Sequence, residues 1–311
     1  MKGTRRGRPP PPGSQRAPFP EDAPSLYVLD AFSHLDIHRW AKQSARLDEL
    51  QTISYYGLEA ERHKHRPALL SALRNAPSIF LDLGEWHRIV EYTYCLDPLS
   101  ARGSVRGYGG RCNIGAEVGD GSISAFPALY LASDLETAYR EFYQIDPKPG
   151  IEGLAPEDFA PRRPGCFLVT QIQGRLEHVF DVNNLSALQP YVKILASFSH
   201  PRGMQQIARS LRLPPGLIRG ASGLRRSVLS KNWRSLPSQF DVPANCQILG
   251  RFLCNAGFEG IRYPSSKSGN PCLAVFPRNL RHSGSFVELS GGYPYQVQTP
   301  RLDAESADRC V

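Results

Sequence analysis

Hydrophobic and polar positions alternate along several short segments in the middle and late parts of the chain. The run from Arg88 to Tyr94 alternates and is rich in β-branched and aromatic residues, which is typical of a strand. Short apolar runs bounded by turn residues predict further strands at residues 128–132, 166–172, 178–182, 260–264 and 272–276. A helix is predicted from Leu135 to Gln144, with Ser133 and Asp134 as candidate N-caps.

Helical periodicity is found before the first predicted strand and again in later parts of the chain. Residues 26–76 contain helix-like patterns, and two further helices are expected between Leu185 and Leu213. Residues 246–254 predict another helix, which Gly257 would end. Strands and helices follow one another with few regular βαβ units, so the order favours an α+β fold of short mixed sheets with flanking helices over a doubly wound sheet.

Changes in composition divide the chain into four parts. Residues 1–24 are rich in proline and arginine and predict a disordered tail. Residues 25–84 are expected to form a helical N-terminal extension, residues 85–285 a catalytic domain, and residues 286–311 a C-terminal tail.

The net charge of +8 is unevenly distributed. One excess lies in the N-terminal tail. The other lies between Asp181 and Asp241, a basic segment with no acidic residue and nine basic ones: Lys193, Arg202, Arg209, Arg212, Arg219, Arg225, Arg226, Lys231 and Arg234. Such a run is usually a solvated face. A polyanion, an acidic partner protein and a diphosphate ligand are the three functional alternatives.

Composition also argues against several classes of protein. The seven cysteines are odd in number and none shows CxxC spacing, so we expect reduced thiols, a cytoplasmic location and no structural zinc site. The histidines show no metal-binding pattern, and no bound metal or cofactor is expected. No apolar run approaches the length of a membrane span, so no membrane association is expected.

Three segments combine residues that could carry chemistry. Gly110 and Arg111 place a flexible backbone beside a guanidinium suited to phosphate. Tyr130 ends a predicted strand, and Glu141 lies near the apolar border of the helix that follows. The polar loop after Tyr263 offers hydroxyls for a sugar or a phosphate. Taken singly, a surface turn explains the first segment better and an exposed helix glutamate explains the second better, while the third looks like many plain hairpin loops.

Together these segments resemble the RES family, named for an arginine, a glutamate and a serine. Five short blocks occur in the family's order between about residues 85 and 277: Trp86–Val90, Gly109–Asn113 with the preceding Asp97–Ser100, Leu129–Ala132 with Glu141, Asn232–Arg234, and Gly257–Ser265. Cys112 replaces the aromatic residue usual in the second block. This replacement leaves open a pseudoenzyme that keeps the fold as a scaffold.

The resemblance implies a fold similar to ADP-ribosyltransferases, with NAD⁺ as substrate in a cleft between short sheets. Catalytic roles fall to Glu141, Arg111 and Tyr130. Substrate-binding roles fall to Arg88, Ser265, Ser266, Gly110 and Asn113, where Ser266 is the alternative to Ser265. The implied activity is that of a toxin which cleaves NAD⁺ by phosphorolysis, with inorganic phosphate as co-substrate, or by hydrolysis.

The sequence alone leaves other activities and partners open. Transfer of ADP-ribose to a target protein uses the same first step, so the same residues would serve it. A helix-turn-helix antitoxin of the Xre type is the partner that the resemblance implies, and a homo-oligomer is left open. A non-enzymatic module that binds nucleic acid or an acidic protein through the basic segment is the alternative outside enzymes.

Overall fold

The computed structural model describes residues 34–148, 154, 166–213 and 216–310. The chain divides between Ala45 and Arg46 into two compact units. The long helix α1 (His34–Lys64) begins in the first unit and continues into the second, which holds every other described element. The predicted N-terminal tail, residues 1–24, lies outside the described residues.

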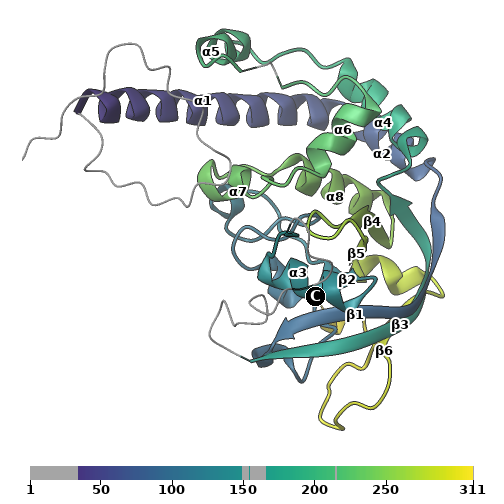
Figure 1. Ribbon diagram of the computed structural model, residues 1–311. Coiled ribbons are helices and arrows are strands. Elements are labelled where there is room, and N and C mark those ends of the chain that lie inside the picture. Colours follow the sequence, from purple (N-terminus) through teal and green to yellow (C-terminus); the bar gives the residue numbers. More distant parts are fainter. Residues whose placement is uncertain (1–33, 149–153, 155–165, 214–215, 311) are drawn as a thin grey trace, which may run out of the picture. The chain divides into compact units, whose positions relative to one another are not determined.

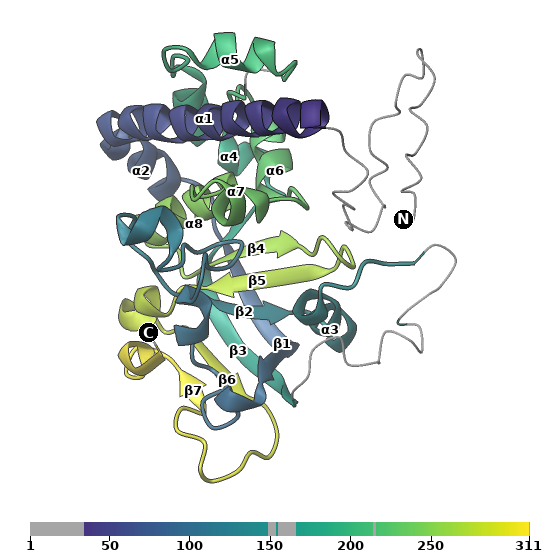
Figure 2. The same ribbon diagram turned by 90° about the vertical axis from the view of Figure 1, so that its left-hand side faces the viewer.

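The strands form one mixed, seven-stranded sheet in the order β1-β2-β5-β4-β3-β6-β7. Neighbours are antiparallel except for β3 and β4, and a further β1–β3 pairing connects the first and fifth strands of that order (Figures 1 and 2). The strands are β1 (Ile79–Glu91), β2 (Leu129–Ala132), β3 (Phe167–Asp181), β4 (Gly260–Pro264), β5 (Pro271–Val275), β6 (Phe286–Leu289) and β7 (Arg301–Leu302).

Helices of the second unit occupy two places beside this sheet. Helices α2, α4, α6 and α8 pack on one another near β4, whereas α3 packs alone on β1 and β2 (Figure 2). The helices after α1 are α2 (Arg66–Arg74), α3 (Leu135–Tyr143), α4 (Leu185–Ala196), α5 (Met204–Ser210), α6 (Ala221–Val228), α7 (Ser235–Gln239) and α8 (Asn245–Ala256). Single 3₁₀ turns cover Tyr92–Tyr94, Arg102–Val105, Val118–Gly121, Pro277–His282 and Ala307–Cys310.

Alternation along the strands separates two hydrophobic clusters. On β2, Leu129 and Leu131 belong to the smaller cluster, together with β6 and β7, while Tyr130 and Ala132 lie on the side of the helices. Side chains of a strand point alternately to its two faces, so this register turns Tyr130 and, on β5, Cys272 toward the helical layer. The candidate site lies on that face.

The α+β class predicted from the sequence is confirmed, although the strands join in one sheet instead of several short ones. The predicted strands at 166–172 and 178–182 are one continuous strand, β3. It does not break at Gly174, because this residue pairs with Leu83 of β1 on one side and with Val287 of β6 on the other. The sheet also begins earlier than residue 85, at Ile79.

The expectation of a C-terminal tail after residue 285 is wrong for the described residues. This segment contributes β6 and β7 to the sheet, and Val287, Leu302 and Ala307 are fully buried. Its hydrophobic positions are few and separated by polar turns, so the sequence pattern hides them. None of the described helices has the length and apolar character needed to cross a membrane.

Candidate active site

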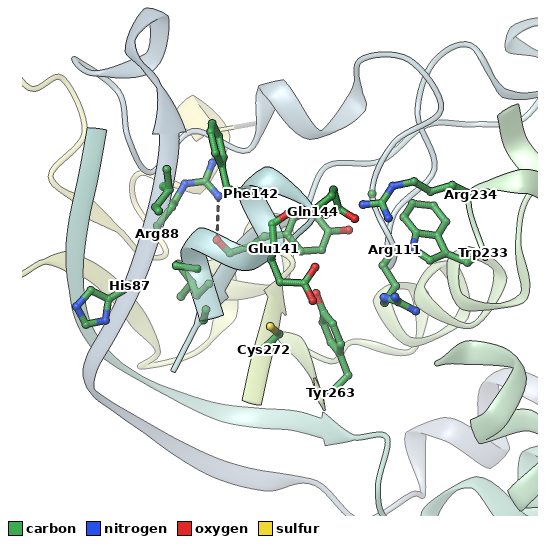
Figure 3. Close-up of a pocket in the computed structure, with 16 residues that line it drawn as sticks. His87, Arg88, Arg111, Glu141, Phe142, Gln144, Trp233, Arg234, Tyr263 and Cys272 are labelled. Carbon is green, nitrogen blue, oxygen red and sulfur yellow. Dashed lines mark hydrogen bonds between the residues drawn. The ribbon is translucent and has the colours of Figure 1, made fainter. Parts of the chain in front are cut away.

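One pocket of about 210 Å³ gathers most of the residues that the sequence singled out (Figure 3). It lies between β1, β2, β5, α3 and the turn before α7. The predicted residues in its lining are Arg88, Gly110, Arg111, Tyr130 and Glu141. The other three predicted residues do not line the pocket, but each hydrogen-bonds to a residue that does: Asn113, Ser265 and Ser266.

Glu141 is held at the pocket by the loop after β4. The Ser265 hydroxyl donates to Glu141 Oε1 over 2.6 Å, although the two residues are 124 positions apart in the chain. The same hydroxyl accepts hydrogen bonds from the backbone N–H groups of Lys267 and Ser268. These contacts fix the direction in which Ser265 donates, and Ser265 in turn orients the carboxylate.

The start of α3 is tied to the same loop. Asp134 caps the helix by accepting from the backbone N–H of Thr137, and its other oxygen accepts from the side chain of Asn270. Burial alone would raise the pKa of Asp134, but hydrogen bonds from Thr137, Ser133 and Asn270 hold it below its usual value. Helix α3 and the loop that bears Ser265 are therefore positioned as one unit.

Arg111 lies opposite, on the glycine-rich loop (residues 107–115), and is nearly fully buried. Its guanidinium donates to the carbonyls of Val228 and Ser230 and to the hydroxyl of Ser266. It also lies near two aromatic rings, those of Trp233 and Tyr263, at 5.8 and 5.9 Å from the ring centroids. Among the described residues, no carboxylate forms an ion pair with Arg111.

The glycine-rich loop is shaped by backbone constraints that only glycine satisfies. Gly109 has a φ of 88°, in the left-handed region. A Cβ atom on Gly110 would come within 2.3 Å of the Tyr130 hydroxyl, so the loop and this ring approach too closely for a side chain. Gly110 therefore presents bare backbone at the pocket wall.

The buried side chain of Asn113 holds this loop in place through hydrogen bonds. Its Oδ1 accepts from the backbone N–H of Gly110 and from the Tyr130 hydroxyl, and its Nδ2 donates to the carbonyls of Ser104 and Phe126. The side chain is fully buried and its hydrogen-bonding capacity is used within the protein.

The Tyr130 hydroxyl is also used within the protein. It donates to Asn113 and accepts from the backbone N–H of Cys112, over 2.7 and 2.9 Å. Burial raises the pKa of Tyr130 well above its usual value, so the hydroxyl stays protonated and donates. A ligand in the pocket would therefore meet the ring of Tyr130 and not a free hydroxyl.

Arg88 on β1 is bound to backbone carbonyls on the other side of the pocket. Its Nε donates to Pro98, Nη1 to Tyr130 and Nη2 to Ser100, over 2.8, 3.0 and 3.0 Å. All three nitrogens thus have protein partners. The guanidinium joins β1, β2 and the loop after β1.

Several residues of the site were missed by sequence reasoning. Trp233 and Arg234 line the pocket, and both occur in the fourth sequence block, to which no role was given. Gln247 of α8 donates to the carbonyls of Tyr108, Gly110 and Asn113, and no sequence signal marks this buried glutamine. Cys272 also lines the pocket, but burial raises the pKa of its thiol, which keeps it protonated and a poor nucleophile.

Among the described residues, the pocket lining carries three arginines and one glutamate, so these four side chains give an excess of two positive charges. Such a pocket suits an anionic ligand, with one carboxylate able to face a developing positive charge. Among the described residues, no group of three or more His, Cys, Asp or Glu side chains could hold a metal ion.

Comparisons with known proteins add little to this picture. No family model matches the sequence, and no curated protein matches it. A search of solved structures finds a chain from the crystal structure of the M. tuberculosis MbcT-MbcA toxin-antitoxin complex, with a TM-score of 0.39 and 15% identity. That likeness covers 78% of this chain and 96% of the other. A TM-score this low assigns neither a family nor an activity.

Proposed function

We propose that the protein is an NAD⁺-consuming enzyme that cleaves the bond between nicotinamide and ribose, and that it acts as a toxin of the RES type. One observation carries the proposal. Glu141, Arg111 and Tyr130, which the sequence blocks single out from separate parts of the chain, line one pocket, where Ser265 hydrogen-bonds to Glu141.

The residue types suit this reaction. As the glycosidic C–N bond breaks, its electron pair leaves with nicotinamide and positive charge develops on the ribose as an oxocarbenium ion. The Glu141 carboxylate would stabilise that charge, because it is the only acidic side chain among the described residues that line the pocket. Arg111 would hold the anionic part of the substrate, and the Tyr130 ring would pack against the nicotinamide ribose.

Water or inorganic phosphate would then add to the anomeric carbon. Water gives ADP-ribose and releases a proton, whereas phosphate gives ADP-ribose 1″-phosphate. A protein nucleophile in the same place would become ADP-ribosylated, which is the alternative activity. The resemblance further suggests a helix-turn-helix antitoxin of the Xre type as a neutralising partner.

Incubation of the purified protein with NAD⁺ tests the proposal directly. The reaction is run with and without inorganic phosphate, and nicotinamide and the ADP-ribose products are separated by mass. We expect nicotinamide release, and the product formed in phosphate distinguishes phosphorolysis from hydrolysis. If no nicotinamide is released in either buffer and labelled NAD⁺ labels no protein, the proposal is wrong.

A further inference from the structure

Three arginines line the pocket, but they differ in what their guanidinium groups already bind. Arg88 donates from all three of its nitrogens to backbone carbonyls. Arg111 donates from Nη1 and Nη2 to two carbonyls and one hydroxyl. The guanidinium of Arg234 forms neither a hydrogen bond nor an ion pair with any other described residue.

Arg234 is nevertheless held in place. Its guanidinium carbon lies 4.7 Å from the centroid of the Trp233 ring, and Trp233 is almost completely buried. Tyr108 packs edge-on against that indole, at 6.2 Å between centroids. Stacking on a fixed ring limits the motion of a guanidinium and leaves its N–H groups free to donate.

The position of Arg234 is consistent with a shared anion site. Figure 3 shows Arg234, Trp233 and Arg111 together on one side of Glu141, with His87 and Arg88 on the other. The Trp233 ring lies near both guanidinium groups, at 4.7 Å from Arg234 and 5.8 Å from Arg111. Two cations around one indole, without a carboxylate partner among the described residues, favour a ligand with two negative charges.

We propose that Arg234 and Arg111, arranged around Trp233, form the subsite that binds the diphosphate of the substrate, and that Arg88, which lies on the other side of Glu141, is not part of it. This inference rests on the proposed function for the identity of the substrate. It also gives one of the nine cations of the basic segment a specific task, while the remaining eight are absent from the pocket lining.

Binding of ADP-ribose and of adenosine to the full chain tests the subsite by calorimetry. Adenosine lacks the diphosphate, so the two ligands separate this subsite from the rest of the pocket. We expect Arg234→Gln to weaken ADP-ribose binding roughly ten- to a hundredfold, as the loss of a charge-assisted hydrogen bond implies, and to leave adenosine binding unchanged. Arg234→Lys should restore part of the lost affinity, since it restores the charge but not the planar fork.

Arg226→Gln is the matched control, because Arg226 is an exposed cation of the same basic segment that does not line the pocket. It should bind ADP-ribose within about twofold of the wild type. Wild-type affinity for ADP-ribose in Arg234→Gln would overturn the proposal. So would the absence of binding of both ADP-ribose and inorganic pyrophosphate by the wild type.

The two proposals fail in different ways. If the wild type leaves NAD⁺ intact but Arg234→Gln still weakens ADP-ribose binding, the proposed function is wrong and the subsite stands. If the wild type consumes NAD⁺ and Arg234→Gln has an unchanged KM and unchanged ADP-ribose affinity, the subsite is wrong and the function stands.

Discussion

Two regions of the pocket use the same kinds of side chain in opposite ways. In the glycine-rich loop and on β1 and β2, the polar groups of Asn113, Tyr130 and Arg88 are bound to other groups of the protein. In the turn before α7, the Arg234 guanidinium contacts only an aromatic ring among the described residues. Residue type alone therefore does not show which arginine has N–H groups available to a ligand; the groups that each guanidinium already binds do.

The largest stability effect is expected in the region whose polar groups are satisfied. Replacing Asn113 by alanine leaves a buried N–H, a hydroxyl and two carbonyls without their partner, so we expect a loss of about 4 kcal/mol in the free energy of unfolding. Urea denaturation measures it. Asn232→Ala, at an exposed position, is the control and should change stability little. Equal stabilities of the two variants would contradict the account of the loop.

Arg88 and Arg234 line the same pocket, but their replacement is expected to change the free energy of unfolding by different amounts. Arg88→Gln should lower the free energy of unfolding by about 3 kcal/mol, because three carbonyls lose a charged donor. Arg234→Gln should change it by less than about 0.5 kcal/mol. Thermal unfolding of both variants under one condition checks the contrast. A larger loss for Arg234→Gln than for Arg88→Gln would reverse the assignment of the two roles.

A smaller, pH-dependent effect on the free energy of unfolding is expected where α3 meets the loop that bears Ser265. Asp134→Ala removes the helix cap and the contact with Asn270, at a cost of about 1 kcal/mol near neutral pH. The pKa of Asp134 is lower in the folded protein than in the unfolded chain, so its contribution is complete above the unfolded pKa and is lost as the pH falls through the folded pKa.

The stability difference between wild type and Asp134→Ala should therefore shrink as the pH falls from neutral toward about 3. Chemical denaturation across that range measures it, with Asp82→Ala as the control at an exposed position. A stability difference that stays constant over this pH range would show that the charge of the Asp134 carboxylate does not contribute to stability.

The candidate residues could be predicted from the sequence because they occur in short blocks with a fixed order, and five of them line one pocket. Glu141 and Ser265 were both expected at the site, and the structure places the Ser265 hydroxyl oxygen 2.6 Å from Glu141 Oε1. The sequence does not show which groups Asn113 and Arg88 bind within the protein, since their partners Phe126, Pro98 and Ser100 become neighbours only after folding.

The same limit explains what the sequence missed. Arg234 is one of nine similar cations of the basic segment, and although it lies in the fourth sequence block, no pattern in that block indicates that its side chain lines the pocket. Gln247 lies in a helix of mainly apolar residues, and its contacts with the glycine-rich loop depend on the packing of α8. The continuity of β3 depends on partners on both of its edges, which no local pattern reveals.

We propose that Glu141 carries the cleavage of NAD⁺, and the rate of nicotinamide release by Glu141→Gln tests this role. Glu136→Gln is the matched control, because it removes a carboxylate from the same helix outside the pocket and can still accept from Arg140. With thermal unfolding unchanged, we expect kcat to fall by about a thousandfold or more in Glu141→Gln and to stay near the wild-type value in Glu136→Gln. A folded Glu141→Gln protein that releases nicotinamide within about tenfold of the wild-type rate would contradict the claim.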